Sequence, residues 1–171
     1  EMRALWEGRE PYGHGERVGI ATMLIQGLYQ ALFERYGDRL GELAARAPGT
    51  AHATEAQIRD WYGPLAEGLL KEQASWGEKV YGPRPFTEEG LRAAAQAVQP
   101  YRLAPEAALA FLGRVGAPQR PQDIAVSPGL VEIALQAAKE VRNRFTILHF
   151  LSELGLLEEL STAVAQEFVQ G

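Results

Sequence analysis

Residues 11–33 read PYGHGERVGIATMLIQGLYQALF and decide the class of fold that this chain adopts. After Glu16, apolar side chains recur three or four residues apart, which is the spacing of one helix face. The apolar run of residues 18–33 is shorter than the roughly 20 residues that a membrane span needs, and it contains Gln26 and Gln30. We therefore predict a buried core helix over residues 16–36, with an inner stripe formed by Val18, Ala21, Ile25, Leu28 and Leu32 and widened by Ile20, Leu24 and Phe33.

The rest of the chain reads as further helices separated by breaks rich in glycine and proline. Thr54, Thr87 and Ser127 each precede a helical pattern and carry a hydroxyl suited to capping, which predicts helix starts there. Pro64 is expected to kink or split the helix that follows Thr54, and Gly155 to break the last segment. Because no segment alternates with the period of a strand, the sequence predicts an all-α domain, a helical bundle. The helix after Ser127 is expected to bury Leu130, Ile133, Ala134, Ala137, Ala138 and Val141.

Composition narrows the functional classes. The chain has 171 residues, enough for one domain with a full core, and its hydrophobic fraction of 46% is typical of globular proteins. A net charge of −5 without a dense basic cluster argues against nucleic acid as a partner. The absence of cysteine excludes disulfides, thiolate catalysis and zinc sites built on cysteine. No signal-peptide pattern opens the chain, so we expect a cytoplasmic protein without membrane association.

The three histidines differ in their surroundings. His14 lies between Gly13 and Gly15 at the start of the core helix, where glycines let a ligand approach closely. A neutral imidazole nitrogen there can bind a metal or exchange a proton, but the glycines can equally form a turn that leaves His14 exposed. A metal site needs three or four ligands, and no His-x-x-x-His or Glu-x-x-His pair lies near His14 in the sequence. His52 reads as a solvated loop residue, and His149 as a core or boundary residue.

Several segments resemble one group of enzymes. The stretch HGERVGIATML, residues 14–24, resembles the His-Gly-Glu segment of the iron-containing alcohol dehydrogenase and dehydroquinate synthase superfamily. Within that superfamily, this stretch and the opening EMRALWEGREPYGHG are closer to the sn-glycerol-1-phosphate dehydrogenases. Residues 116–151, which include RNRFTIL, resemble the closing pattern of the same group. The middle of the chain, about residues 38–110, adds little to the resemblance.

The resemblance implies a fold and a set of site residues. It implies that residues 1–171 form a single α-helical metal and substrate domain, the C-terminal domain of a dehydroquinate synthase-like fold. The N-terminal nucleotide-binding domain and the other metal ligands would precede Glu1 and be absent from this chain. His14 matches the second metal-ligating histidine. Arg142 and Arg144 lie where related families place basic residues near the substrate phosphate, although a solvated helix end explains them equally well. Glu16 is expected to complement the helix start, and no residue here is assigned a catalytic or cofactor-binding role.

The function implied by the resemblance is that of the metal- and substrate-binding half of an NAD(P)-dependent, metal-dependent polyol-phosphate dehydrogenase, inactive by itself. The metal would be zinc, nickel or iron, and the fragment alone is expected to bind neither metal nor NAD(P). A glycerol dehydrogenase or dehydroquinate synthase-like enzyme is an alternative within the superfamily. A non-catalytic helical interaction module is the alternative from another class. A face left open by the missing domain would favour a homo-oligomer.

Overall fold

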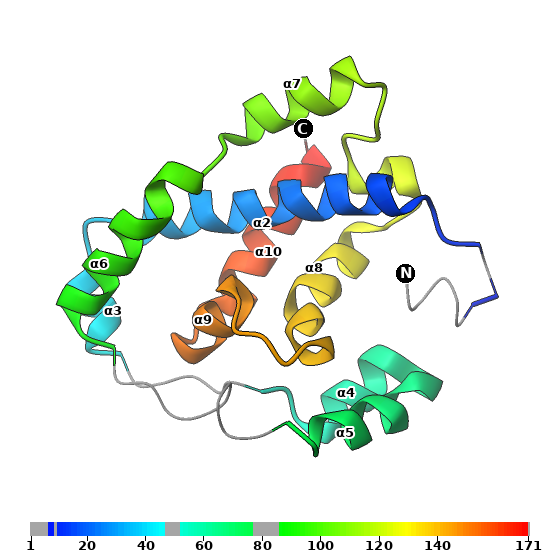
Figure 1. Ribbon diagram of the computed structural model, residues 1–171, viewed down its shortest axis with the longest axis horizontal. Coiled ribbons are helices and arrows are strands. Elements are labelled where there is room, and N and C mark those ends of the chain that lie inside the picture. Colours follow the sequence, from blue (N-terminus) through cyan, green and yellow to red (C-terminus); the bar gives the residue numbers. More distant parts are fainter. Residues whose placement is uncertain (1–6, 9, 47–51, 77–85, 171) are drawn as a thin grey trace.

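The computed structural model describes residues 7, 8, 10–46, 52–76 and 86–170 (Figure 1). Within these residues every regular element is a helix and none is a strand, which confirms the all-α prediction. The α-helices are α2 (His14–Tyr36), α3 (Leu40–Ala44), α4 (Glu55–Tyr62), α5 (Ala66–Gln73), α6 (Glu88–Val98), α7 (Pro105–Arg114), α8 (Pro128–Ala137), α9 (Ile147–Glu153) and α10 (Leu157–Gln170). Short 3-10 turns join or extend them: η1 (Gly63–Leu65), η3 (Gln99–Tyr101), η4 (Pro121–Ile124) and η5 (Ala138–Val141).

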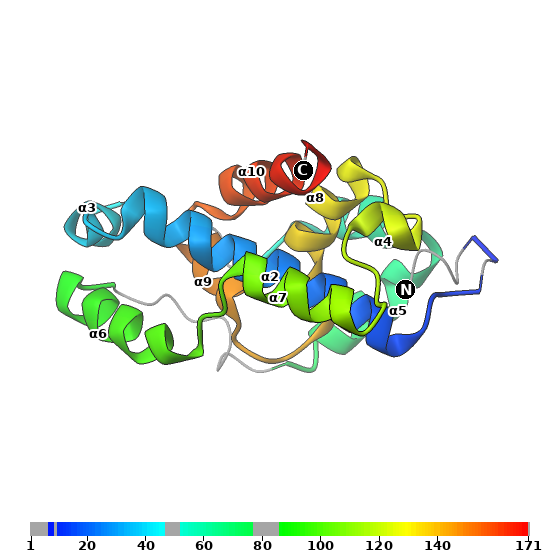
Figure 2. The ribbon, with the colours of Figure 1, turned by 90° about the horizontal axis from the view of Figure 1, so that it is seen from above.

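Helix α2 runs across the molecule, and the other helices are arranged around it (Figures 1 and 2). It begins at His14, two residues before the predicted start, and ends at Tyr36 as predicted. Its buried face differs from the predicted stripe, since Val18 and Ala21 are exposed. Because α10 packs over Gly27, the inner face is rotated toward this glycine. The buried residues are Ile20, Met23, Leu24, Gly27, Leu28, Ala31 and Leu32.

The main core lies where α10 packs against both α2 and α8. Leu28 of α2 and Leu160 and Val164 of α10 are completely buried there. Helix α7 covers a different part of α2, where the Leu112 side chain lies over Gly19. A methyl group at Gly19 would lie 3.1 Å from Leu112 Cδ2, so the small residue allows this close packing. The region follows the pattern of helix-on-helix layers around one shared core.

A second, smaller core lies under α4 and α5. Ile58, Tyr62, Ala66 and Leu69 bury their side chains together with Ala137 at the end of α8. Helix α8 is thus shared by the two cores, because Val131 and Leu135 belong to the main one. This sharing corrects the inner face predicted for α8: Ala134 and Ala138 are exposed, and Val131 and Leu135 are buried instead.

The predicted helix starts are confirmed by side-chain caps. The hydroxyl oxygen of Thr54 accepts a hydrogen bond from the Gln57 amide at 3.2 Å, and that of Thr87 accepts one from the Gly90 amide at 3.0 Å. Ser127 accepts a longer bond of 3.4 Å from the Leu130 amide. Each bond satisfies a backbone N–H that the first helical turn leaves without a helical partner.

The predicted breaks are also confirmed within the described residues. Pro64 lies in η1, which separates α4 from α5, and Gly155, with φ of +66°, separates α9 from α10. The predicted connector at residues 81–86 lies outside the described residues except for Phe86. None of the helices that the structure describes combines the length and the hydropathy that a membrane span requires.

Candidate functional site

His14 is the first residue of α2, and its side chain is exposed. The Gly13 amide donates a hydrogen bond of 2.7 Å to Glu16 Oε2, so Glu16 closes the first turn of the helix as predicted. Within the part of the chain that the structure describes, a methyl group built at Gly15 would meet no atom within 4 Å, so the position next to His14 is open. The glycine frame therefore provides both the turn and an approach to the imidazole.

Among the described residues, His14 is the metal ligand that the resemblance implies, and this role stays a prediction. Nowhere among them do three histidine, aspartate or glutamate side chains gather into a group that could hold a metal ion. An exposed imidazole in an open glycine frame fits one position of a metal site, whereas zinc needs three or four ligands. His14 thus fits the metal that the resemblance implies only if further ligands come from residues other than those described.

Arg142 and Arg144 are exposed in the segment that joins η5 to α9. This segment follows the C-terminal end of α8, whereas η4, at the other end of α8, packs against α2 (Figure 1). The structure therefore does not bring the two arginines next to His14. A role for them in binding a phosphate stays a prediction.

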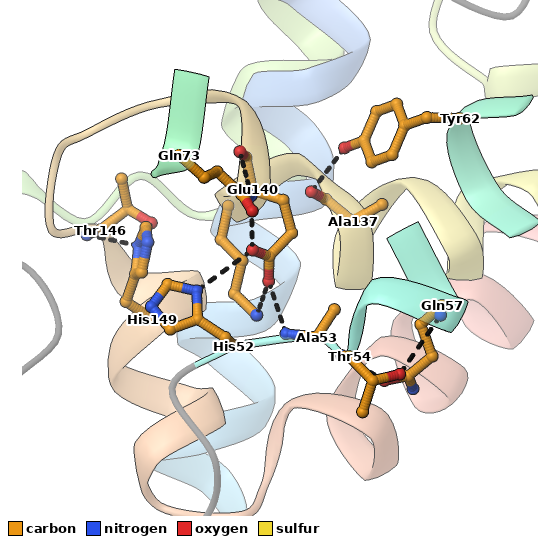
Figure 3. Close-up of polar contacts among 11 residues, drawn as sticks. His52, Ala53, Thr54, Gln57, Tyr62, Gln73, Ala137, Glu140, Thr146 and His149 are labelled. Carbon is orange, nitrogen blue, oxygen red and sulfur yellow. Dashed lines mark hydrogen bonds and ion pairs between the residues drawn. The ribbon is translucent and has the colours of Figure 1, made fainter. Parts of the chain in front are cut away.

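A buried polar cluster that no sequence motif marked surrounds Glu140 (Figure 3). The Glu140 side chain is completely buried. Its carboxylate lies 3.2 Å from His52 Nδ1 and accepts hydrogen bonds of 2.9 Å from the Ala53 amide and 3.1 Å from Gln73 Nε2. The neighbouring Lys139 ammonium group, also buried, forms an ion pair with it. We refer to His52, Ala53, Gln73, Lys139 and Glu140 as the Glu140 cluster.

Burial and the cluster contacts act on the pKa of Glu140 in opposite directions. Burial raises the pKa of this carboxyl, because a charge is less stable away from water. The hydrogen bond with His52, the charge of Lys139 and the Ala53 amide all lower it, and together they outweigh burial. The net result is a pKa below the ordinary value for glutamate, so Glu140 is a carboxylate at neutral pH.

The Glu140 cluster joins three parts of the chain. Glu140 lies in η5, His52 and Ala53 precede α4, and Gln73 ends α5 and donates a second hydrogen bond, of 2.9 Å, to the Glu140 carbonyl oxygen. Close by, the Tyr62 hydroxyl donates a 2.7 Å hydrogen bond to the Ala137 carbonyl (Figure 3). Burial raises the pKa of that hydroxyl, which keeps it protonated as a donor. The arrangement fastens α4 and α5 to the end of α8.

Two histidine predictions are settled by these contacts. His52 was expected to be a solvated loop residue, and this is wrong, because it is partly buried against Glu140. His149 was expected to pack in the core, and this is confirmed by its burial. The His149 ring stacks on Phe145 at 5.8 Å, and Nδ1 accepts a hydrogen bond of 3.3 Å from the Thr146 amide. The sequence signal that could have revealed this buried pair is the adjacent charges of Lys139 and Glu140, which lie between the apolar residues Ala138 and Val141.

Comparison with known proteins gives this geometry a context. The chain is 27% identical over 159 residues to a glycerol-1-phosphate dehydrogenase (NAD(P)+) of Geobacillus stearothermophilus. That alignment covers 92% of this chain and 31% of the relative. The chain is a distant homologue of part of that enzyme. A glycerol-1-phosphate dehydrogenase (NAD(P)+) of Bacillus licheniformis is 26% identical over 160 residues, which cover 94% of this chain and 28% of the relative.

This chain therefore spans about a third of the length of the glycerol-1-phosphate dehydrogenases that it matches. The resemblance read from the short motifs at both ends is confirmed, since the similarity extends over nearly the whole chain. The all-helical architecture is consistent with the helical domain that this resemblance implies. No family model and no solved structure matches the chain.

Proposed function

We propose that this chain is the metal- and substrate-binding part of an NAD(P)-dependent, metal-dependent polyol-phosphate dehydrogenase of the glycerol-1-phosphate dehydrogenase type. The observation that supports the proposal is the homology over 92% of the chain to enzymes whose names record that activity. Because the match covers only 31% of the relative, residues other than these would bind the nucleotide and complete the metal site. Residues 1–171 would then act as one helical domain of a larger catalytic unit.

His14 carries the chemical part of the proposal. When bound, a divalent metal such as zinc stabilises the negative charge that develops on the substrate oxygen as hydride leaves the adjacent carbon. A neutral imidazole holds such a metal without cancelling its charge. His14 is exposed at the start of α2, and the space beside Gly15 is open. The imidazole nitrogens of His14 are therefore accessible to a metal and to a substrate.

Arg142 and Arg144 are a separable part of the proposal. A guanidinium group presents a planar fork of donors that suits a phosphate, and both side chains are exposed. The two arginines follow the C-terminal end of α8, away from His14 at the start of α2. Their role therefore depends on a substrate or a domain arrangement that spans the distance between the arginines and His14. The alanine double variant of these arginines therefore tests phosphate binding independently of the metal.

The test uses the whole gene product that contains this chain. We expect NAD(P)+-dependent oxidation of glycerol-1-phosphate that is lost on treatment with EDTA and restored by zinc. The variant His14→Ala removes one of three or four ligands and is expected to lose both activity and bound metal. Glu89→Ala, exposed on α6, is the matched control and is expected to keep both.

Two results would contradict the proposal. Undiminished activity and metal content in His14→Ala would remove His14 from the metal site. Oxidation of glycerol but not of glycerol-1-phosphate would replace the proposed substrate with that of a glycerol dehydrogenase.

A further inference from the structure

A cleft of about 280 Å³ opens beside the Glu140 cluster. Its walls come from the segment before α4, from α4 itself, from the end of α8 and from the junction of α9 with α10. His52 and Lys139 belong both to the cleft lining and to the Glu140 cluster. The cleft is therefore at the opposite end of α8 from η4, which packs against α2. We call it the α4–α8 cleft.

Hydrogen-bond donors and hydrogen-bond acceptors both line the α4–α8 cleft. Gln136 contributes an amide and Glu158 a carboxylate, and neither side chain forms a hydrogen bond or ion pair within the described part of the chain. Gln57 uses its Oε1 atom to accept a 2.9 Å hydrogen bond from the Thr54 amide, which leaves its NH2 group as a donor. Side-chain amides and carboxylates can each pair with adjacent hydroxyl groups of a ligand, since they offer two polar atoms a short distance apart.

Trp61 provides an apolar wall to the same cleft. Its side chain is half-buried and packs against the second core. An indole ring supplies a large, stiff apolar surface at the edge of an otherwise polar site. This combination of one aromatic wall with side-chain amides and a carboxylate suits a ligand that has both C–H and O–H surfaces.

The charges around the cleft exclude two other classes of ligand. Within the described residues no three metal-ligating side chains meet, so the cleft does not form a cation site. The positive charge of Lys139 is matched by Glu140, and Glu158 adds a negative charge to the wall. A phosphate or another polyanion therefore finds no net excess of positive charge there.

We propose that the α4–α8 cleft binds a small, uncharged polyhydroxylated molecule of the sugar or polyol class. This site lies apart from His14 and goes beyond the proposed dehydrogenase function. The Glu140 cluster gives it a rigid wall, because buried hydrogen bonds and an ion pair fix His52 and Lys139 before any ligand arrives. A wall that is fixed in advance lowers the entropic cost of binding.

The experiment is a titration of the protein with D-sorbitol and with D-glucose, followed in amide proton–nitrogen NMR spectra. We expect shifts concentrated on residues of the cleft. The variants Gln136→Ala and Glu158→Ala each remove hydrogen bonds to the ligand and are expected to weaken binding about fivefold. Gln122→Ala, exposed in η4, is the matched control and is expected to bind as the parent does.

Unfolding temperatures measured beside the titrations show whether each variant keeps its fold. The proposal would be overturned if neither compound changed the chemical shifts of cleft residues, or if both cleft variants bound the compounds as tightly as the parent. It would also be overturned if inorganic phosphate changed these chemical shifts and the two hydroxylated compounds did not. None of these outcomes depends on dehydrogenase activity, so the test is separate from that of the proposed function.

Discussion

Glu140 is the residue whose environment differs most from what its type leads one to expect. A glutamate is rarely buried unless it is paired, and here one carboxylate has four partners from three parts of the chain. Sequence periodicity did not include Glu140 in the inner face predicted for its helix, and it does not reveal His52 or Gln73 as partners. Those partners lie 88 and 67 residues away in the chain, so only the folded structure brings them together.

Replacement of Glu140 by glutamine should destabilise the protein strongly. Glu140→Gln removes the carboxylate that pairs with the buried Lys139 ammonium, and breaking a buried ion pair costs about 3–5 kcal/mol. Urea unfolding followed by circular dichroism measures the loss. The double variant Lys139→Met, Glu140→Gln removes both members of the buried pair and should recover part of the stability. A single variant as stable as the parent would mean that the ion pair contributes nothing net.

The pH dependence of the free energy of unfolding should also show the contribution of the Glu140 carboxylate. The pKa of Glu140 is lower in the folded protein than in the unfolded chain, so its contribution is complete above the unfolded-state value of about 4.3. The contribution is lost as the pH falls through the depressed folded-state pKa, because the carboxylate must then be protonated. Glu140→Gln should therefore lose less stability than the parent on acidification. An identical acid dependence in the two proteins would contradict this assignment.

Helix boundaries are the part of this fold that the sequence predicts best. The caps at Thr54, Thr87 and Ser127 and the breaks at Pro64 and Gly155 depend on residues within one turn, so local chemistry determines them. The inner faces of α2 and α8 were predicted less well. Which face is buried depends on where α10 and α4 pack, and this is a property of the tertiary arrangement.

The cap of α4 offers a quantitative test. Thr54 Oγ1 accepts the Gln57 amide, and the Gln57 side chain in turn accepts the Thr54 amide, so both backbone donors depend on this pair. Thr54→Ala should lower the free energy of unfolding by about 1 kcal/mol. Thr22→Ala, exposed within α2, is the control and should be neutral or slightly stabilising, because alanine has the higher helix propensity. Equal effects of the two changes would show that the cap does not stabilise the helix.

At the scale of the whole molecule, the core depends on how closely α10 approaches α2. A methyl group built at Gly27 would lie 3.2 Å from a ring carbon of Phe168 and 3.3 Å from Val164 Cγ1. The absence of a side chain on Gly27 therefore allows the two helices to pack closely. A glycine in the middle of an apolar run signals such an approach, but the sequence does not say which helix makes it.

Two glycine substitutions separate packing from helix propensity. Gly27→Leu must fit a large side chain between α2 and α10, and overpacking of this kind costs about 1–3 kcal/mol or more. Gly68→Leu, on the exposed side of α5 where a methyl group meets nothing within 4 Å, should leave stability unchanged or raise it. Thermal unfolding compares the two variants. If Gly27→Leu proved as stable as Gly68→Leu, the close approach of α10 would be wrong.

In the candidate site, too, the sequence marks individual residues but does not predict how they are arranged in space. Short motifs marked His14, Arg142 and Arg144, and the homology over nearly the whole chain supports the resemblance on which those assignments rest. Helix packing, which no motif encodes, determines that His14 at the start of α2 and the two arginines after η5 lie in different parts of the fold. The α4–α8 cleft likewise joins residues from distant segments and has no signature in the linear chain.

The packing of α2 against α10 also determines the stage of protein synthesis at which the main core can form. Helices α3 to α9 all lie between α2 and α10 in the sequence, so the apolar face of α2 remains without α10 until these helices have been synthesised. Contacts between distant segments form only after a long loop has closed, which slows folding relative to a bundle of sequential neighbours. Until α10 has been synthesised, the nascent chain carries the apolar face of α2 without this partner, and exposed apolar surface of this kind favours aggregation.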